Sequence, residues 1–280
     1  MKIIFPTITM LILLAAPLTG CQPVQMETPQ RPEPAIPQAT ATPPARSSPP
    51  AATATPGISA ASPTSTVIPD HLALTPVLSD YAFPDVTDPA RQYLFYLHGK
   101  IIEDQGFPAI DPVYGEYEYG QILEKLAGNG FEVISEQRPK NTDSGEYAGR
   151  VAGQVTALLK AGVPANNITI VGASKGAGIT ILASDLLKNK EINFVIMAIC
   201  DPATVEELRQ NQIFLYGNVL SIFDSSDQLA GSCQDLFTFS EGKGINRSDE
   251  MILNLGTGRG ILYKPLDEWI IPVVQWAGKP

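Results

Sequence analysis

The sequence predicts an α/β domain with a mainly parallel sheet of about six or more strands flanked by helices. Two observations predict this class. Short apolar runs rich in β-branched and aromatic residues recur over the C-terminal part of the chain, and segments with helical spacing of apolar residues separate most of them. Uninterrupted apolar runs are typical of strands that are buried on both faces of a parallel sheet.

The expected strands share this apolar, β-rich composition. In chain order they are YLFYL (93–97), FEVIS (131–135), ITIV (168–171), FVIMAI (194–199), VLSIF (219–223) and MILNL (251–255). Parallel neighbours among them require right-handed crossover connections. In open sheets of this kind, ligands bind at the carboxyl ends of the strands, so that edge is the place to search for a site.

The expected helices lie between these strands and after the last one. The first, 119–128, carries apolar residues at Ile122, Leu123 and Leu126, the spacing of one helix face. Similar spacing predicts helices over 147–159, 177–187 and 266–276. No internal repeat is visible.

Residues 1–20 are expected to be an export signal. Lys2 precedes an apolar run that is too short for a comfortable membrane span. The tetrapeptide 18–21 (LTGC) resembles the lipobox of bacterial lipoproteins, which implies that Cys21 is acylated and becomes the new N-terminus; an accidental cysteine is the alternative. The residue after the cysteine is Gln22 and not Asp, the residue that would signal retention in the inner membrane. In a bacterium with two membranes the resemblance therefore favours sorting to the outer membrane. The lipid would anchor the folded part to the outside of the cell membrane.

Residues 21–79 are expected to form a disordered tether. The segment from 22 to 69 contains 12 of the chain's 25 prolines and almost no large apolar residues, so it cannot bury enough surface to offset the entropy of ordering. A proline-rich ligand for a partner's groove is the alternative reading, without a specific pattern to support it. Residues 80–280 are long enough for one domain with a complete core.

Charge and cysteine content limit the classes of function. The net charge is −10 and the basic residues do not cluster, which argues against a nucleic-acid partner. If Cys21 is acylated, the remaining cysteines are Cys200 and Cys233. We expect these two to form a disulfide in an exported protein, and two separate buried thiols are the alternative. They fall short of the four ligands of a structural zinc site, and no metal or cofactor is predicted.

A nucleophile motif lies between the third expected strand and the helix that follows it. Gly172-Ala173-Ser174-Lys175-Gly176 fits the G-x-S-x-G pattern, in which the serine occupies a strained turn and the glycines allow strand and helix to pass closely. The same turn directs the amide of Lys175 toward the group that Ser174 would attack. This position predicts a nucleophile elbow rather than a chance match.

The segment from about residue 91 to the C-terminus resembles the α/β-hydrolase family, and within it the small bacterial esterase or lipase-like proteins. His98-Gly99 resembles the family's turn after the oxyanion strand, which implies that the amide of Lys100 completes the oxyanion hole. The run VLSIFDSSDQ resembles the turn that supplies the acid, and strand length favours Asp227 over Asp224. The run GTGRGILYKP resembles the turn that supplies the catalytic histidine. The order of serine, acid and this turn is the hydrolase order.

Arg259 occupies the position at which this resemblance calls for histidine. A guanidinium is charged at every relevant pH and has no lone pair, so it cannot act as the general base. We expect it either to pair with Asp227 or to bind a carboxylate or phosphate of a ligand. The sequence contains two histidines: His71 lies in the tether, and His98 is expected to shape its own turn. The Lys175 amine is poorly directed for a serine–lysine dyad, and Glu136 and Arg138 are expected to form a structural ion pair.

These observations favour a membrane-anchored α/β-hydrolase-family protein with lost or impaired esterase activity and a pocket for a small ester, acyl or anionic molecule. An active serine esterase with an unidentified base is the first alternative. A structural or partner-binding envelope lipoprotein is the second. No particular protein partner is indicated.

Overall fold

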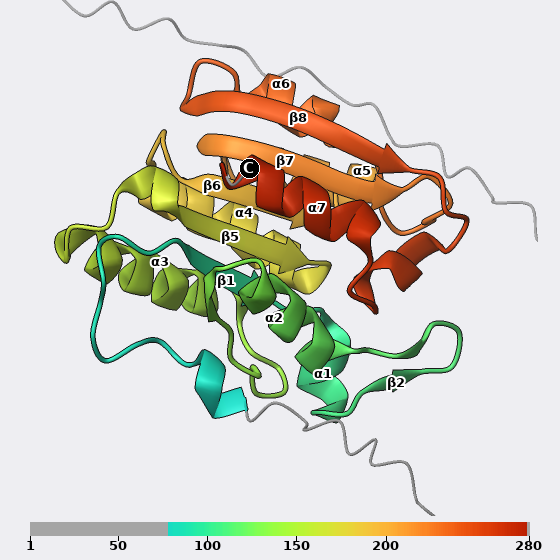
Figure 1. Ribbon diagram of the computed structural model, residues 1–280. Coiled ribbons are helices and arrows are strands. Elements are labelled where there is room, and N and C mark those ends of the chain that lie inside the picture. Colours follow the sequence, from blue (N-terminus) through green and yellow to red (C-terminus); the bar gives the residue numbers. More distant parts are fainter. Residues whose placement is uncertain (1–77, 279–280) are drawn as a thin grey trace, which may run out of the picture. The chain divides into compact units, whose positions relative to one another are not determined.

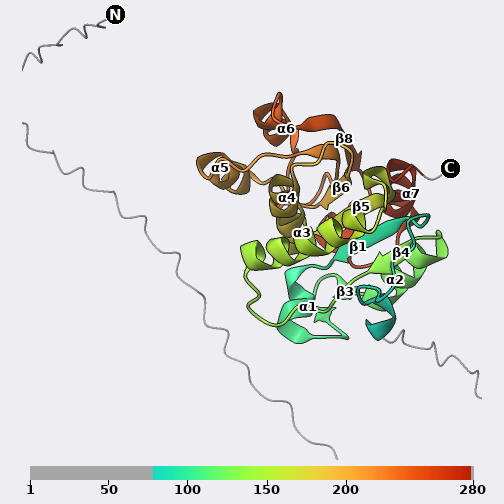
Figure 2. The same cartoon turned by 90° about the vertical axis from the view of Figure 1, so that its left-hand side faces the viewer.

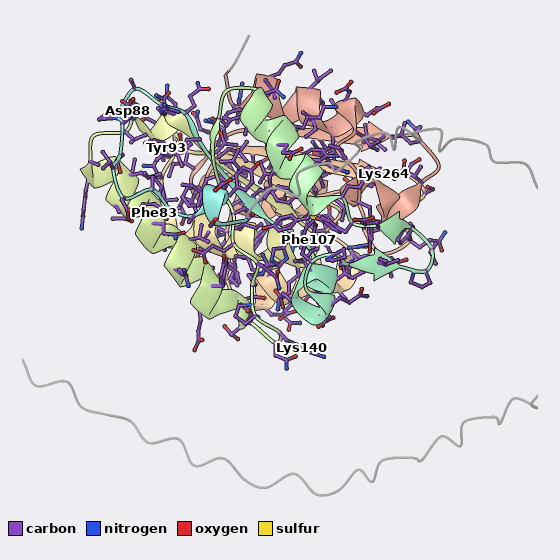
Figure 3. The ribbon with its side chains drawn as sticks, turned by 60° about the horizontal axis from the view of Figure 1, so that its bottom comes forward. Phe83, Asp88, Tyr93, Phe107, Lys140 and Lys264 are labelled. Atoms are coloured by element: carbon purple, nitrogen blue, oxygen red, sulfur yellow. A yellow bond between two sulfur atoms is a disulfide. The ribbon has the colours of Figure 1, made fainter. Side chains whose placement is uncertain are left out.

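The computed structural model describes residues 78–278. The expected signal peptide, the lipobox with Cys21, the tether up to residue 77, and His71 lie outside the described residues. Within the described part, the N-terminal segment begins with η1 (Leu78–Tyr81) and is tied to the first strand. The Tyr93 hydroxyl accepts a hydrogen bond from the Asp88 N–H at 2.9 Å and donates to the Asp88 carbonyl at 3.2 Å, and Figure 3 shows the two residues close together.

A six-stranded sheet, parallel throughout, forms the centre of the fold (Figure 1). Its order is β4-β1-β5-β6-β7-β8, with bounds Glu132–Ile134, Tyr93–Leu97, Ile168–Ala173, Asn193–Met197, Gly217–Asp224 and Ile245–Leu253. A separate antiparallel hairpin joins β2 (Ile110–Asp111) to β3 (Gly115–Glu116). The predicted fold class is therefore confirmed: the sheet is parallel, has six strands and is flanked by helices, as expected of an α/β-hydrolase fold.

Helices cover both faces of this sheet, and Figure 2 shows the two layers from the side. One layer contains α2 (Tyr119–Gly128) and α7 (Asp267–Trp276), with the short α1 (Lys100–Gln105) beside them. The other contains α3 (Ser144–Lys160), α4 (Lys175–Leu187), α5 (Pro202–Gln210) and α6 (Gln234–Ser240). The remaining short turns are η2 (Ala165–Asn167) and η3 (Gly258–Leu262).

The two layers enclose two separate hydrophobic cores. Side chains alternate across β1: Leu94 and Tyr96 enter the core under α2 and α7, whereas Tyr93, Phe95 and Leu97 enter the core under α3 and α4. Because both faces are buried, the strand reads as a continuous apolar run. This burial is the physical basis of the pattern that predicted the sheet.

Several elements differ from expectation. The strand β6 stops at Met197 rather than at 199, because Ala198 and Cys200 adopt positive φ angles of 52° and 64°. The strand β8 begins at Ile245, six residues before the expected start, and its early residues are polar and exposed. The helices α1, α5 and α6 and the β2–β3 hairpin were not expected from periodicity because each is short.

The predicted disulfide between Cys200 and Cys233 is present, with both residues buried. It joins the loop after β6 to the start of α6. None of the helices within residues 78–278 is long and apolar enough to span a bilayer.

Candidate functional site

Ser174 occupies a sharp turn between β5 and α4, as the motif predicts. Its φ is 53°, and its N–H donates to the Met197 carbonyl at 2.9 Å, which ties the turn to the end of β6. A Cβ added at Gly176 would lie 1.9 Å from the Leu97 carbonyl oxygen, and one at Gly172 would lie 2.2 Å from the Gly176 oxygen. Glycine is required at both positions because the backbones of β1, β5 and α4 touch here.

Arg259 lies on η3 and reaches Ser174. Its Nη2 donates to the Ser174 Oγ at 3.2 Å and to the Ala198 carbonyl at 2.8 Å. Its Nη1 lies 3.3 Å from both carboxylate oxygens of Asp227. The guanidinium therefore fills the space between the serine and the acid, and one nitrogen serves both carboxylate oxygens instead of a two-nitrogen fork.

Asp227, rather than Asp224, faces this space. The Asp227 side chain is only 2% exposed and also accepts from the Leu229 N–H at 2.9 Å. Asp224 is buried and accepts hydrogen bonds from Ser226 and from the Leu255 N–H, so it holds the acid turn together. Asp227, the acid expected from strand length, is therefore the carboxylate that contacts Arg259.

His98 lies in the turn after β1 and does not reach the serine hydroxyl. Its Nδ1 is 2.8 Å from the Gly99 carbonyl, and its Nε2 accepts from the Arg138 N–H at 2.9 Å. Burial first, and then the charge of Arg138, lowers the pKa of His98 to about 3. The imidazole is thus neutral near pH 7, has both nitrogens engaged, and cannot serve as the base for Ser174.

The two expected oxyanion amides begin two helices that meet at the serine. Lys100 is the first residue of α1 and Lys175 the first of α4, positions whose N–H groups have no acceptor within their own helix. A Cβ at Gly99 would lie 3.9 Å from the Ser174 Cβ, so the His98-Gly99 turn is next to the elbow. Lys100, Lys175, Ser174 and Arg259 all line one cavity of about 310 Å³.

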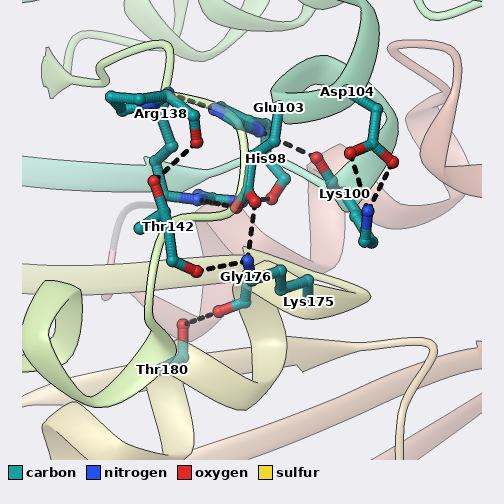
Figure 4. A network of polar contacts seen from close by, with 11 residues as sticks. His98, Lys100, Glu103, Asp104, Arg138, Thr142, Lys175, Gly176 and Thr180 are labelled. Carbon is teal, nitrogen blue, oxygen red and sulfur yellow. Dashed lines mark hydrogen bonds and ion pairs between the residues drawn. The ribbon is translucent and has the colours of Figure 1, made fainter.

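The Lys175 amine lies in a buried polar network (Figure 4). It donates to Glu103 Oε2 and to the Thr142 carbonyl, both at 2.6 Å. Glu103 Oε1 accepts from Arg138 Nε at 2.6 Å, and Arg138 Nη2 donates to the His98 carbonyl. One fully buried carboxylate thus connects the elbow helix to the His98-Gly99 turn.

This network corrects one expectation and adds a residue that the sequence did not reveal. Glu136 and Arg138 do not pair with each other: Glu136 pairs with Arg150 at 2.7 Å, and Arg138 with Glu103. Each residue instead pairs with a partner from a distant segment, Arg150 on α3 and Glu103 on α1, which explains the error. Nothing in the local pattern around Glu103 indicates its role, because both of its partners are far away in sequence.

The lining of the cavity contains three cations, Lys100, Lys175 and Arg259, and one carboxylate, Asp201. Each cation at its rim already faces a carboxylate: Arg259 faces Asp227, Lys175 faces Glu103, and Lys100 lies 2.5 Å from an Asp104 oxygen. Both terminal nitrogens of Arg259 are engaged by protein acceptors. Across residues 78–278, no group of three or more His, Cys, Asp or Glu side chains is placed to hold a metal ion.

Comparisons with known proteins give only distant structural likenesses. No protein-family model matches the sequence, and no curated protein matches it. SOBER1 from Arabidopsis thaliana is similar in structure, with 13% identity over 68% of this chain and 98% of that one and a TM-score of 0.46. A phospholipase/carboxylesterase from Dyadobacter fermentans shares 14% identity over 69% of this chain and 94% of that one, with a TM-score of 0.45. Values this low say nothing about activity.

Proposed function

We propose that this chain is an α/β-hydrolase-family protein in which serine esterase activity is lost or strongly impaired and binding of a small acyl compound is retained. The observation that supports the proposal is the position of Arg259. Its guanidinium lies 3.2 Å from the Ser174 Oγ, where a base would have to accept the hydroxyl proton. A group that only donates hydrogen bonds cannot accept that proton.

The charges of the cavity indicate what kind of ligand it takes. Because its cations are already paired with carboxylates, the cavity offers little unpaired positive charge to a free anion. The amides of Lys100 and Lys175 and the Ser174 hydroxyl supply hydrogen-bond donors to a neutral acceptor. A neutral acyl carbonyl therefore suits the cavity better than a phosphate or a carboxylate does.

A fluorophosphonate probe tests the proposal, because it labels serines that an adjacent base activates. We expect incubation of the purified full chain with the probe to leave Ser174 unlabelled, as measured by mass spectrometry of the peptide that contains it. An active serine esterase in the same tube is the positive control. Labelling of Ser174 at the rate of that control would instead support a competent esterase.

We further propose that Cys21 carries a lipid that holds the protein on the cell envelope, on the basis of the LTGC motif. Metabolic labelling with a palmitate analogue in a bacterial host tests this. We expect incorporation in the parent chain and none in Cys21→Ser. Equal labelling of both chains would assign the lipid elsewhere.

A further inference from the structure

A second polar cavity lies at the opposite edge of the sheet from Ser174. Its volume is about 340 Å³, at the small end of the range for ligand sites. It opens at the amino ends of the parallel strands, and since β5 has six residues, about 20 Å of strand separates it from the serine. It is therefore distinct from the site described above.

Side-chain amides dominate the lining of this cavity. Asn193 and Asn218, at the starts of β6 and β7, form its inner wall, where Asn218 Nδ2 donates to Asn193 Oδ1 at 3.1 Å. Asn193 Nδ2 in turn donates to the Asn166 carbonyl at 3.0 Å. These bonds hold the inner amides in fixed orientations.

Three further amides at the cavity still have hydrogen-bonding capacity. Among residues 78–278, the side chains of Asn166 and Asn167 make no hydrogen bond to another protein group. Gln92 Oε1 is buried and likewise has no partner in this part of the chain. Leaving such an acceptor unpaired is unfavourable, and the soft terminal torsion of Gln92 can turn it toward a donor in the cavity.

Another wall of this cavity is a stacked pair of side chains, Arg247 and Trp276. The Arg247 guanidinium carbon lies 3.8 Å from the centre of the Trp276 ring, and its Nη2 donates to the Trp276 carbonyl at 3.1 Å. Trp276 Nε1 donates to the Asn218 carbonyl at 3.3 Å. The pair is thus held rigidly and gives a flat, partly apolar surface beside the amides.

This lining selects a class of ligand. Among residues 78–278, no carboxylate lines the cavity, which disfavours a metal cation, and the one cation of this part of the chain that lines it, Arg247, is already engaged with Trp276, which disfavours a phosphate. An amide both donates and accepts hydrogen bonds, as a hydroxyl does, and the edge of the stacked Arg247–Trp276 pair gives a partly apolar border beside these amides. We propose that this cavity binds a neutral saccharide through Gln92, Asn166 and Asn167, with the Arg247–Trp276 pair beside the ring.

Nuclear magnetic resonance of the ¹⁵N-labelled full chain tests the proposal. Methyl β-glucopyranoside, N-acetylglucosamine and inorganic phosphate are titrated separately. We expect one of the sugars to shift the side-chain amide signals of Gln92 and Asn167 and the Trp276 indole signal, with half-saturation at about millimolar concentration, as is usual for a ligand of this size. The indole signal of Trp269, which is fully buried, should not move.

Matched variants complete the test. We expect the double variant Gln92→Ala/Asn167→Ala to weaken binding at least tenfold while its backbone spectrum stays folded, and Gln210→Ala, an exposed amide on α5, to bind as the parent does. Shifts with phosphate alone, shifts with neither sugar, or unchanged binding by the double variant would each overturn the proposal. Because Ser174→Ala leaves this cavity untouched, the outcome is independent of the proposed esterase site.

Discussion

At the scale of single residues, the guanidinium of Arg259 and the carboxylate of Glu103 determine the chemistry of the elbow. Arg259 donates hydrogen bonds to Ser174, Asp227 and Ala198 at once, so it holds the turn together and fills the space between the serine and the acid. Glu103 is the carboxylate that faces two cations, the fully buried Arg138 and the partly buried Lys175. Each role leads to a substitution with a defined outcome.

Arg259→His is expected to raise ester hydrolysis by at least ~10²-fold, the lower end of what a general base contributes. The imidazole would lie between Ser174 and Asp227 and could accept the hydroxyl proton. Initial rates with p-nitrophenyl acetate measure the effect, and Arg259→His/Ser174→Ala is the control for background hydrolysis. A folded revertant that is no faster than the parent would show that this turn is not the histidine turn.

Glu103→Gln is expected to destabilise the fold by about 3–5 kcal/mol, because it removes the counter-charge from Arg138 and Lys175. The neighbouring Asp104→Asn removes only the exposed pair with Lys100 and should change the free energy of unfolding far less. Urea unfolding followed by circular dichroism compares the two variants. Similar midpoints for both would mean that the buried network contributes no more than a surface pair.

At the scale of elements, the position of Ser174 depends on how closely β1, β5 and α4 approach one another. The contacts that forbid a side chain at Gly176 are with backbone atoms of Leu97 and His98, which cannot move aside as a flexible side chain can. The strand-to-helix turn is thus determined by main-chain packing as well as by the serine.

Gly176→Ala is accordingly expected to prevent stable folding or to cost several kcal/mol, since its Cβ would lie 1.9 Å from the Leu97 oxygen. Gly149→Ala in α3 is the matched control, because nothing lies within 4 Å of the added atom. That change should stabilise the protein by about 0.4–1 kcal/mol. Thermal unfolding of both variants gives the comparison, and a normal melting temperature for Gly176→Ala would refute the packing argument.

Sequence patterns predicted the elements that are buried on both sides or have one apolar face. The bounds of β1 and α2 agree with prediction to the residue. The first half of β8 was missed because it lies at the edge of the sheet, where polar side chains are tolerated. The helix α5 was missed on periodicity, although Asp201 and Pro202 are a typical helix start and could have revealed it.

Only part of the candidate site could be predicted from sequence patterns. The elbow could be predicted because its glycines and serine are adjacent in sequence, whereas Asp227 and Arg259 were expected only because their turns resemble the acid and histidine turns of α/β-hydrolases. The bond from Arg259 to the Ala198 carbonyl could not be predicted, since it depends on a positive φ at a residue without a sequence signal. The role of Glu103 could not be predicted either, because Glu103, Arg138 and Lys175 come from three segments that lie side by side only in the folded chain.

At the scale of the whole molecule, the disulfide joins the start of α6 to the loop after β6, which forms part of the wall of the Ser174 cavity. Cys200 follows Ala198 and Ile199, which line that cavity, and Cys233 precedes α6. The bond encloses a loop of 33 residues. It therefore limits how far this wall can open when the chain unfolds locally.

Cys200→Ala/Cys233→Ala is expected to lower the free energy of unfolding by about 3–4 kcal/mol, from the entropy of a loop of this length. Parallel urea titrations of the oxidised parent and the double variant measure the difference. The parent treated with a reducing agent provides a second estimate without mutation. A variant as stable as the oxidised parent would indicate that the loop is equally ordered without the bond.

The two outermost strands have a consequence for how molecules meet at high concentration. The strand β4 has only three residues, and β8 exposes Asn246, Arg247, Ser248 and Asp249 in its first half. A short edge strand on one side of the sheet and a polar, charged edge strand on the other disfavour edge-to-edge strand pairing between molecules. Crowded copies of this protein should consequently resist fibre formation, a property set by the least hydrophobic strand of the sheet.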